Sequence, residues 1–236
     1  MRPLLIVKAG STYPHIAACF GDFDDWFRAR LDRSTTALQT VSATTDDPLP
    51  DATAFSGIII TGSHAMVTDR LPWSVRTADW IKRAVDERVP LLGVCYGHQL
   101  LAQALGGVVA DLPGGKQIGT VSVQLTDSGC DNRLFSHVPK QFDAQACHRQ
   151  CVCELPRGAT RLAKTSMDPH HAFAVGDCAW GIQFHPEFSA TVLQAYLDHE
   201  ADALAAQGQD GPAQTESLHD TPHSEALLRR FQQLCV

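Results

Sequence analysis

Residues 89–107, VPLLGVCYGHQLLAQALGG, constrain the fold of this chain more than any other stretch. The apolar run at 90–94 is too short for a helix and predicts a strand buried on both faces of a parallel sheet. From His98 onward the apolar residues recur with helical spacing, and Gly106 ends the pattern as glycine commonly ends a helix. The strand must therefore turn sharply into the helix, and Cys95 lies at this turn.

Cys95 is flanked by Gly93 and Gly97 in the pattern GVCYG. This is the cysteine counterpart of the G-x-S-x-G nucleophile elbow, in which the glycines let two backbone segments approach closely. The exposed N–H groups and the dipole at the start of the helix favour a thiolate and can stabilise an oxyanion. The alternative is a buried structural cysteine, which is common for an isolated pattern of this kind. A reactive Cys95 therefore needs a partner elsewhere in the chain.

Predicted strands and helices alternate through the first half of the chain. Strands are predicted at 4–7, 36–43 and 55–61, and amphipathic helices at 22–31 and 73–88. The alternation predicts an α/β fold, an open and mostly parallel sheet with helices on both faces and ligands at the carboxyl ends of the strands. Beyond these elements, short apolar runs separated by turn residues indicate a strand-rich segment, at 108–110, 118–125, 151–155, 172–175 and 180–184.

The C-terminal part is predicted to return to helix at 189–206. Residues 207–222 are polar and contain glycine and proline, which indicates a loop, and residues 223–235 are predicted to form a closing helix. Since no internal repeat marks a boundary, we expect one domain over residues 1–236.

The composition of the chain excludes several function classes. The formal net charge is -7 over 236 residues and lysine and arginine do not cluster, which argues against nucleic-acid and anionic-membrane partners and leaves small-molecule substrates. Only four consecutive apolar residues precede Lys8, too few for a signal peptide, so a cytoplasmic location is expected. The eight cysteines form no compact disulfide framework and are expected to be thiols.

A second segment, GIQFHPEF at 181–188, supplies partners for Cys95. In an extended segment residues i and i+2 share a face, so His185 and Glu187 can point to one region while Pro186 ends strand pairing. A nucleophilic cysteine needs a base and an acceptor that orients the base, and these residue types fit. The alternative is an ordinary surface turn.

Together, GVCYGHQ and GIQFHPE resemble the paired signatures of the class I (triad-type) glutamine amidotransferases, and most closely the stand-alone members similar to the glutaminase domain of GMP synthetase. The resemblance extends over about residues 4–206, and the closing segment DTPHSEALLRRF is also similar. It implies a flavodoxin-like fold with Cys95 as nucleophile, His185 as general base and acid, and Glu187 as the orienting carboxylate. No cofactor is implied.

The resemblance also implies a reaction, in which Cys95 attacks a γ-glutamyl amide carbonyl and the resulting thioester is hydrolysed. It places the two oxyanion donors at Gly62 and Tyr96, and it implies that Gln99 and His148 help to hold the substrate. A Ser-His-x-Asp stretch, which binds the α-amino and α-carboxylate groups in the family, corresponds here to CHRQ, so that Gln150 replaces the acidic residue.

This replacement leaves the substrate open between free glutamine and a γ-glutamyl peptide or conjugate. A catalytically silent binding module with the same fold is the alternative from another class. Because no nucleotide-binding P-loop is present, the chain is either an ammonia donor for a separate synthase subunit or a free-standing hydrolase. Neither the CHRQCVC cluster nor the pair His170 and His171 matches a metal-binding pattern, so no metal is expected.

Overall fold

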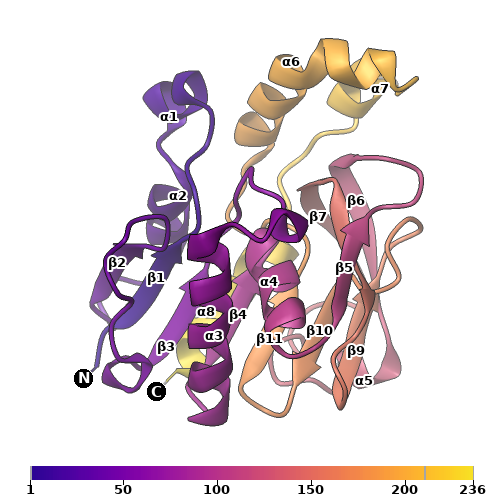
Figure 1. Cartoon of the computed structure of the whole chain (residues 1–236). Coiled ribbons are helices and arrows are strands. Elements are labelled where there is room, and N and C mark those ends of the chain that lie inside the picture. The colour runs from indigo at the N-terminus through magenta and orange to yellow at the C-terminus, as the bar shows by residue number, and fades with distance from the viewer. Residues whose placement is uncertain (1, 210, 236) are drawn as a thin grey trace.

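The computed structural model describes residues 2–209 and 211–235. A nine-stranded sheet in the order β2-β1-β3-β4-β11-β10-β9-β6-β7 forms its centre, and β5 and β8 form a small second sheet (Figure 1). The strands are β1 (Leu4–Lys8), β2 (Leu38–Ser42), β3 (Gly57–Ile60), β4 (Leu91–Val94), β5 (Val108–Asp111), β6 (Gln117–Leu125), β7 (Gln141–His148), β8 (Gln150–Glu154), β9 (Ala159–Lys164), β10 (Ala172–Val175) and β11 (Ala179–Ile182). The α-helices are α1 (Pro14–Phe20), α2 (Phe23–Arg30), α3 (Pro72–Asp86), α4 (Tyr96–Ala104), α5 (Asp127–Cys130), α6 (Ala190–Ala206), α7 (Gly211–Glu216) and α8 (Pro222–Leu234).

The parallel part of the sheet consists of β2, β1, β3, β4 and β11. Its strands are mostly apolar and buried, as expected when helices cover both faces. In β1, Leu5 and Val7 belong to the core that includes α3 and α4, whereas Leu4 and Ile6 belong to the core that includes α2 and α8. The predicted α/β class with helices on both faces is confirmed, and the strand order is that of a flavodoxin-like sheet.

The antiparallel part extends the sheet from β11 through β10, β9, β6 and β7. The strand-rich segment was predicted, but β7 and β9 were not, because their sequences QFDAQACH and ATRLAK contain polar residues on the exposed face instead of an apolar run. The short helices α1 and α5 were not predicted either. Nevertheless β7 is important for the site, since it ends at His148.

The C-terminal region differs from the prediction at one point. The segment 207–222, predicted to be a loop, contains the short helix α7, in which Pro212 occupies the second position, where proline needs no hydrogen-bonding N–H. The closing helix is present as α8 and buries Leu227, Leu228 and Phe231. Among the described residues, no helix combines the length and the apolar character needed to cross a bilayer.

Candidate active site

Cys95 occupies a strained turn between β4 and α4. Its backbone angles are φ 52° and ψ −101°, a combination that residues other than glycine rarely adopt. A Cβ atom on Gly93 would lie 2.3 Å from the carbonyl oxygen of Gly97, and one on Gly97 would lie 2.5 Å from that of Ile60. The two glycines of the GVCYG pattern are therefore required by close backbone contacts, as the elbow interpretation predicted.

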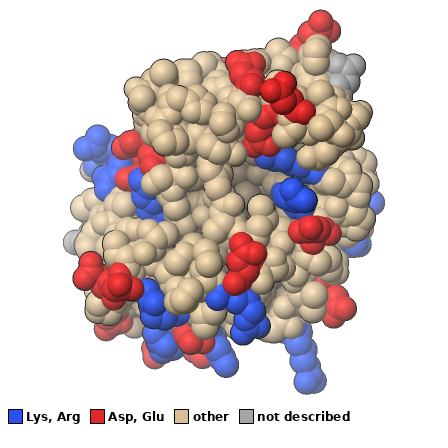
Figure 2. Space-filling view, turned by 45° about the horizontal axis from the view of Figure 1, so that its top comes forward, with Lys and Arg blue, Asp and Glu red and all other residues tan. Residues whose placement is uncertain are grey.

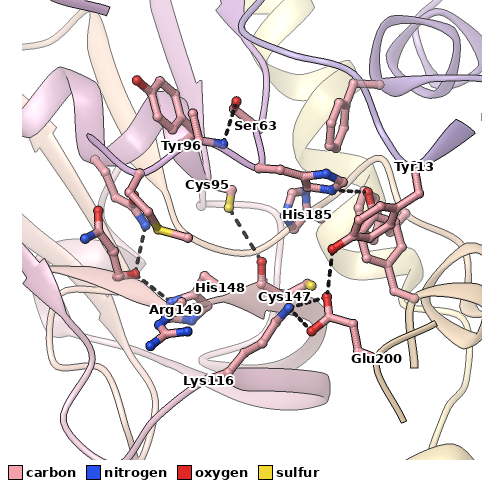
Figure 3. A pocket seen from close by; sticks show the side chains of 18 residues that line it. Tyr13, Ser63, Cys95, Tyr96, Lys116, Cys147, His148, Arg149, His185 and Glu200 are labelled. Carbon is pink, nitrogen blue, oxygen red and sulfur yellow. Dashed lines mark hydrogen bonds and ion pairs between the residues drawn. The ribbon is translucent and has the colours of Figure 1, made fainter. Parts of the chain in front are cut away.

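His185 and Glu187 follow β11, which pairs directly with β4, so they reach the elbow from the neighbouring strand. Nδ1 of His185 lies 2.7 Å from Oε1 of Glu187, both side chains are buried, and His185 lines the same cavity as Cys95. Phe188 stacks on the imidazole at a centroid distance of 4.0 Å and restricts its orientation. The structure thus places the His185 and Glu187 pair beside Cys95, and Figure 3 shows Cys95 and His185 on the same side of the cavity. The roles of the three residues in catalysis remain predictions.

The electrostatic surroundings keep His185 protonated. Burial alone would lower the pKa of His185, but the neighbouring Glu187 carboxylate and the Cys95 sulfur raise this pKa to about 10. An imidazolium between a carboxylate and a thiolate is the charge arrangement of an activated cysteine nucleophile. In such an arrangement the thiol proton has already passed to the imidazole, which can give it to a leaving group.

The predicted oxyanion donors border the same space. Gly62 follows β3, and a Cβ atom there would lie 2.9 Å from Cε1 of His185. Tyr96 is the first residue of α4, where the N–H groups have no partner within the helix, and its hydroxyl hydrogen-bonds with Ser74 at 2.6 Å. Their positions at the ends of adjacent strands suit an oxyanion site, and their use as donors remains a prediction.

A cavity of about 110 Å³ opens beside Cys95 at the carboxyl edge of the parallel strands. Figure 2 shows the face onto which it opens as a hollow with basic side chains at its rim. Lys116 and Glu200 form an ion pair in the wall, with the Tyr13 hydroxyl 3.4 Å from Glu200, and Arg149 is exposed on the wall near His148 (Figure 3).

Gln99 and His148 lie in the cavity wall, but their side-chain nitrogen atoms have protein partners. Nε2 of Gln99 donates to the carbonyl of Gln150 at 2.8 Å and to Oε1 of Gln183 at 3.0 Å. Nδ1 of His148 donates to the same Gln150 carbonyl at 2.9 Å. Burial lowers the pKa of His148 to about 3, so its ring is neutral. Both side chains hydrogen-bond the Gln150 carbonyl and so hold this part of the wall in place. Direct substrate contact by either side chain remains a prediction.

Several wall residues were not identified from the sequence, namely Tyr13, His64, Lys116, Tyr196 and Glu200. They come from the chain before α1, the loop after β3, the turn before β6, and α6. The sequence pattern of α6 indicates only an amphipathic helix, and nothing in it marks Glu200 as the partner of a lysine 84 positions away.

Comparison with known proteins identifies the family of this chain. The family model for glutamine amidotransferase class-I matches residues 19–203. The chain belongs to the class-I glutamine amidotransferase family. It is 31% identical over 188 residues to γ-glutamyl peptidase 4 of Arabidopsis thaliana, and the matched region covers 78% of this chain and 73% of that protein.

Two further relatives bear on the fold and on the domain arrangement. The chain is 30% identical over 189 residues to the glutamine-hydrolyzing GMP synthase of Aeropyrum pernix, which covers 80% of this chain but 33% of that protein. The crystal structure of a glutamine amidotransferase from Thermotoga maritima superposes with a TM-score of 0.74 at 21% identity, covering 100% of this chain and 99% of the other. The predicted family and fold are confirmed.

Proposed function

We propose that this protein hydrolyses γ-glutamyl amide bonds through a thioester on Cys95. The observation that carries the proposal is the buried His185 and Glu187 pair, with His185 beside Cys95 in the wall of the same cavity. A silent binding module would not need a strained cysteine held against a protonated imidazole.

The reaction follows from the positions of these groups. The Cys95 sulfur attacks the γ-carbonyl carbon, a C–S bond forms, and the carbonyl oxygen takes the negative charge beside Gly62 and Tyr96. His185 gives its proton to the amide nitrogen, the C–N bond breaks, and the amine leaves. Water then attacks the thioester while His185 accepts its proton, and glutamate and the thiolate are released.

We infer further that the preferred substrates are γ-glutamyl conjugates. The proton donor His185 must face the leaving amine, and Tyr13 and Glu200 lie on the His185 side of Cys95, whereas Arg149 lies on the other side (Figure 3). A wall with an ion pair and an aromatic ring on the leaving-group side suits an amine larger than ammonia. The relative named γ-glutamyl peptidase supports this class.

Supply of ammonia to a separately encoded synthase subunit is the second candidate. It is supported by the GMP synthase relative, in which the matched region is about a third of the protein. The Gln150 replacement does not separate the two candidates, because glutamine and γ-glutamyl conjugates carry the same α-ammonium group.

A substrate panel tests the proposal. Ammonia release from glutamine and glutamate release from a γ-glutamyl dipeptide are measured for the wild type and for Cys95→Ala. We expect kcat/KM to be at least about tenfold higher on the dipeptide, and no turnover by the variant. Covalent labelling with a glutamine-like diazo ketone, followed by intact-mass analysis, should modify the wild type alone. An active, labelled Cys95→Ala protein would refute the mechanism, and equal rates on both substrates would refute the preference.

The Lys116 side chain offers a sharper test of the leaving-group side. Lys116→Met should raise KM for the dipeptide more than for glutamine, whereas Lys140→Met, which breaks an exposed ion pair with Asp127, should change neither value. An equal rise in KM for both substrates would place the ion pair outside the leaving-group side.

A further inference from the structure

A second group of ligand-type side chains lies behind the cavity wall. His148 ends β7, while Asp168 and His171 lie in the turn between β9 and β10, and all three side chains are buried. Each offers one ligand atom, and these atoms all lie within 4.8 Å of one another. Buried clusters of imidazole and carboxylate are uncommon unless they are catalytic or hold an ion, and the proposed reaction does not use this one.

The Asp168 carboxylate brings a negative charge into the core. The side chain is 0% exposed and accepts hydrogen bonds from the His170 N–H at 2.9 Å and from His171 Nδ1 at 3.1 Å. Among the described residues His171 is its ion-pair partner, and no lysine or arginine pairs with it. A buried carboxylate is costly without a compensating positive charge.

Each histidine presents a ring nitrogen close to a side-chain oxygen, at 3.1 Å between His171 and Asp168 and at 2.9 Å between His148 and Gln117. Nδ1 of His171 faces Oδ2 of Asp168, so this nitrogen, and not Nε2 on the far edge of the ring, is the atom that can share an ion with the carboxylate. Binding of a metal ion there would displace the proton that lies between the two groups.

The His148 ring shows a related mismatch. Nδ1 donates to the Gln150 carbonyl, so Nε2 carries the lone pair, and it lies 2.9 Å from Oε1 of Gln117. The amide nitrogen of Gln117 points to the Thr165 hydroxyl at 3.3 Å. In this orientation of the Gln117 amide, Nε2 and Oε1 both present lone pairs to the same space, where a cation could accept both.

We propose that His148, Asp168 and His171 bind a Zn²⁺ ion, with Oε1 of Gln117 completing the ligand set. The ligand spacing leaves a point within about 2.8 Å of all three atoms, so small rotations reach the ~2.0–2.2 Å of zinc bonds. Imidazole nitrogen and carboxylate oxygen suit Zn²⁺ better than Mg²⁺ or Ca²⁺.

The ion would have a structural role. His148 and Gln150 belong to the wall beside Cys95, whose thiol lies 3.7 Å from the neighbouring Cys147 carbonyl. Zinc would hold the turn from His148 to Gln150 in place from the side that faces away from the cavity, and it would not contact the substrate. The sequence shows no metal-binding pattern because the ligands are single residues from separate strands and turns, and no metal was expected.

Metal analysis of the full chain tests the proposal. After expression with Zn²⁺ and extensive desalting, we expect about one zinc per chain. Asp168→Asn and His171→Gln should each lose the zinc, and His137→Gln, at an exposed position, should keep it. A wild-type protein without zinc, or an Asp168→Asn protein that keeps it, would overturn the proposal.

A second measurement needs no variant and therefore stands even if the variants fold poorly. The wild type is produced with Co²⁺ in place of Zn²⁺, and its absorption spectrum is recorded. Ligation by nitrogen and oxygen gives d–d bands alone, as expected here. A thiolate-to-cobalt charge-transfer band would place the ion on the cysteines, for example Cys151 and Cys153, and would refute the assignment. Neither readout depends on the proposed γ-glutamyl hydrolysis.

Discussion

A Cβ atom added to Gly62 would lie 2.9 Å from Cε1 of the His185 imidazole, a distance that real Cβ contacts almost never show. The end of β3 and the imidazole thus approach so closely that only glycine fits between them. Gly62→Ala should displace the ring from Cys95 and lower kcat by about 10- to 100-fold. Steady-state kinetics on the dipeptide substrate measure the effect, and near-wild-type thermal unfolding would show that the fold is kept. Gly211→Ala is the matched control, because nothing lies within 4 Å of the added atom. An unchanged kcat in Gly62→Ala would contradict the close contact.

The Glu187 carboxylate should set the alkaline limit of activity. It raises the pKa of His185, which must be protonated to release the amine, so the rate falls only when the pH rises through about 10. Glu187→Gln removes the charge, and the alkaline limb of the kcat profile should move to lower pH while kcat falls by about 10²-fold or more. Glu225→Gln, at a partly exposed ion pair with Arg30, serves as the control and should leave the profile in place. An alkaline limb that does not move in Glu187→Gln would disprove the link.

The same interaction predicts how stability depends on pH. The His185 pKa rises from an ordinary 6.5 to about 10 on folding, so the stabilisation is complete below pH 6.5 and is lost as the pH rises through about 10. Urea unfolding of the wild type and His185→Gln should therefore show a difference in unfolding free energy that shrinks between pH 6 and pH 10.5. A constant difference would mean that the imidazole is not held in its charged form.

Gln99 should stabilise the wall as well as the site. Gln99→Leu conserves volume but leaves Oε1 of Gln183 buried without its donor, which should cost about 1–3 kcal/mol of unfolding free energy. KM should also rise, because the Gln150 carbonyl loses one of its two donors. Gln103→Leu on the same helix is the control, because the Gln103 side chain forms no hydrogen bond with another described residue. Equal stability of the two variants would contradict this role.

The sequence predicted the parts of the molecule in which local pattern and tertiary contact agree. The apolar run of β4, the glycines around Cys95 and the apolar stripe of α4 all indicate the same turn, and the parallel topology then brings His185 to it. Strands such as β7 lack an apolar run and form through pairing with β6, which the local sequence does not record. The Lys116 and Glu200 pair depends on how α6 packs over the cavity, and no spacing rule connects two such distant residues.

The positive φ of Cys95 makes the position unfavourable for any side chain, and its effect on stability is measurable. Cys95→Ala and Cys95→Gly both remove the sulfur, but only glycine accepts φ 52° without strain. Denaturant unfolding should therefore give the glycine variant a free energy of unfolding about 1–2 kcal/mol higher than that of the alanine variant. Replacement of the nucleophile by glycine therefore removes catalysis and at the same time raises the free energy of unfolding. In relatives that are no longer selected for catalysis, glycine at this position should be favoured, and such relatives should be well-folded binding proteins.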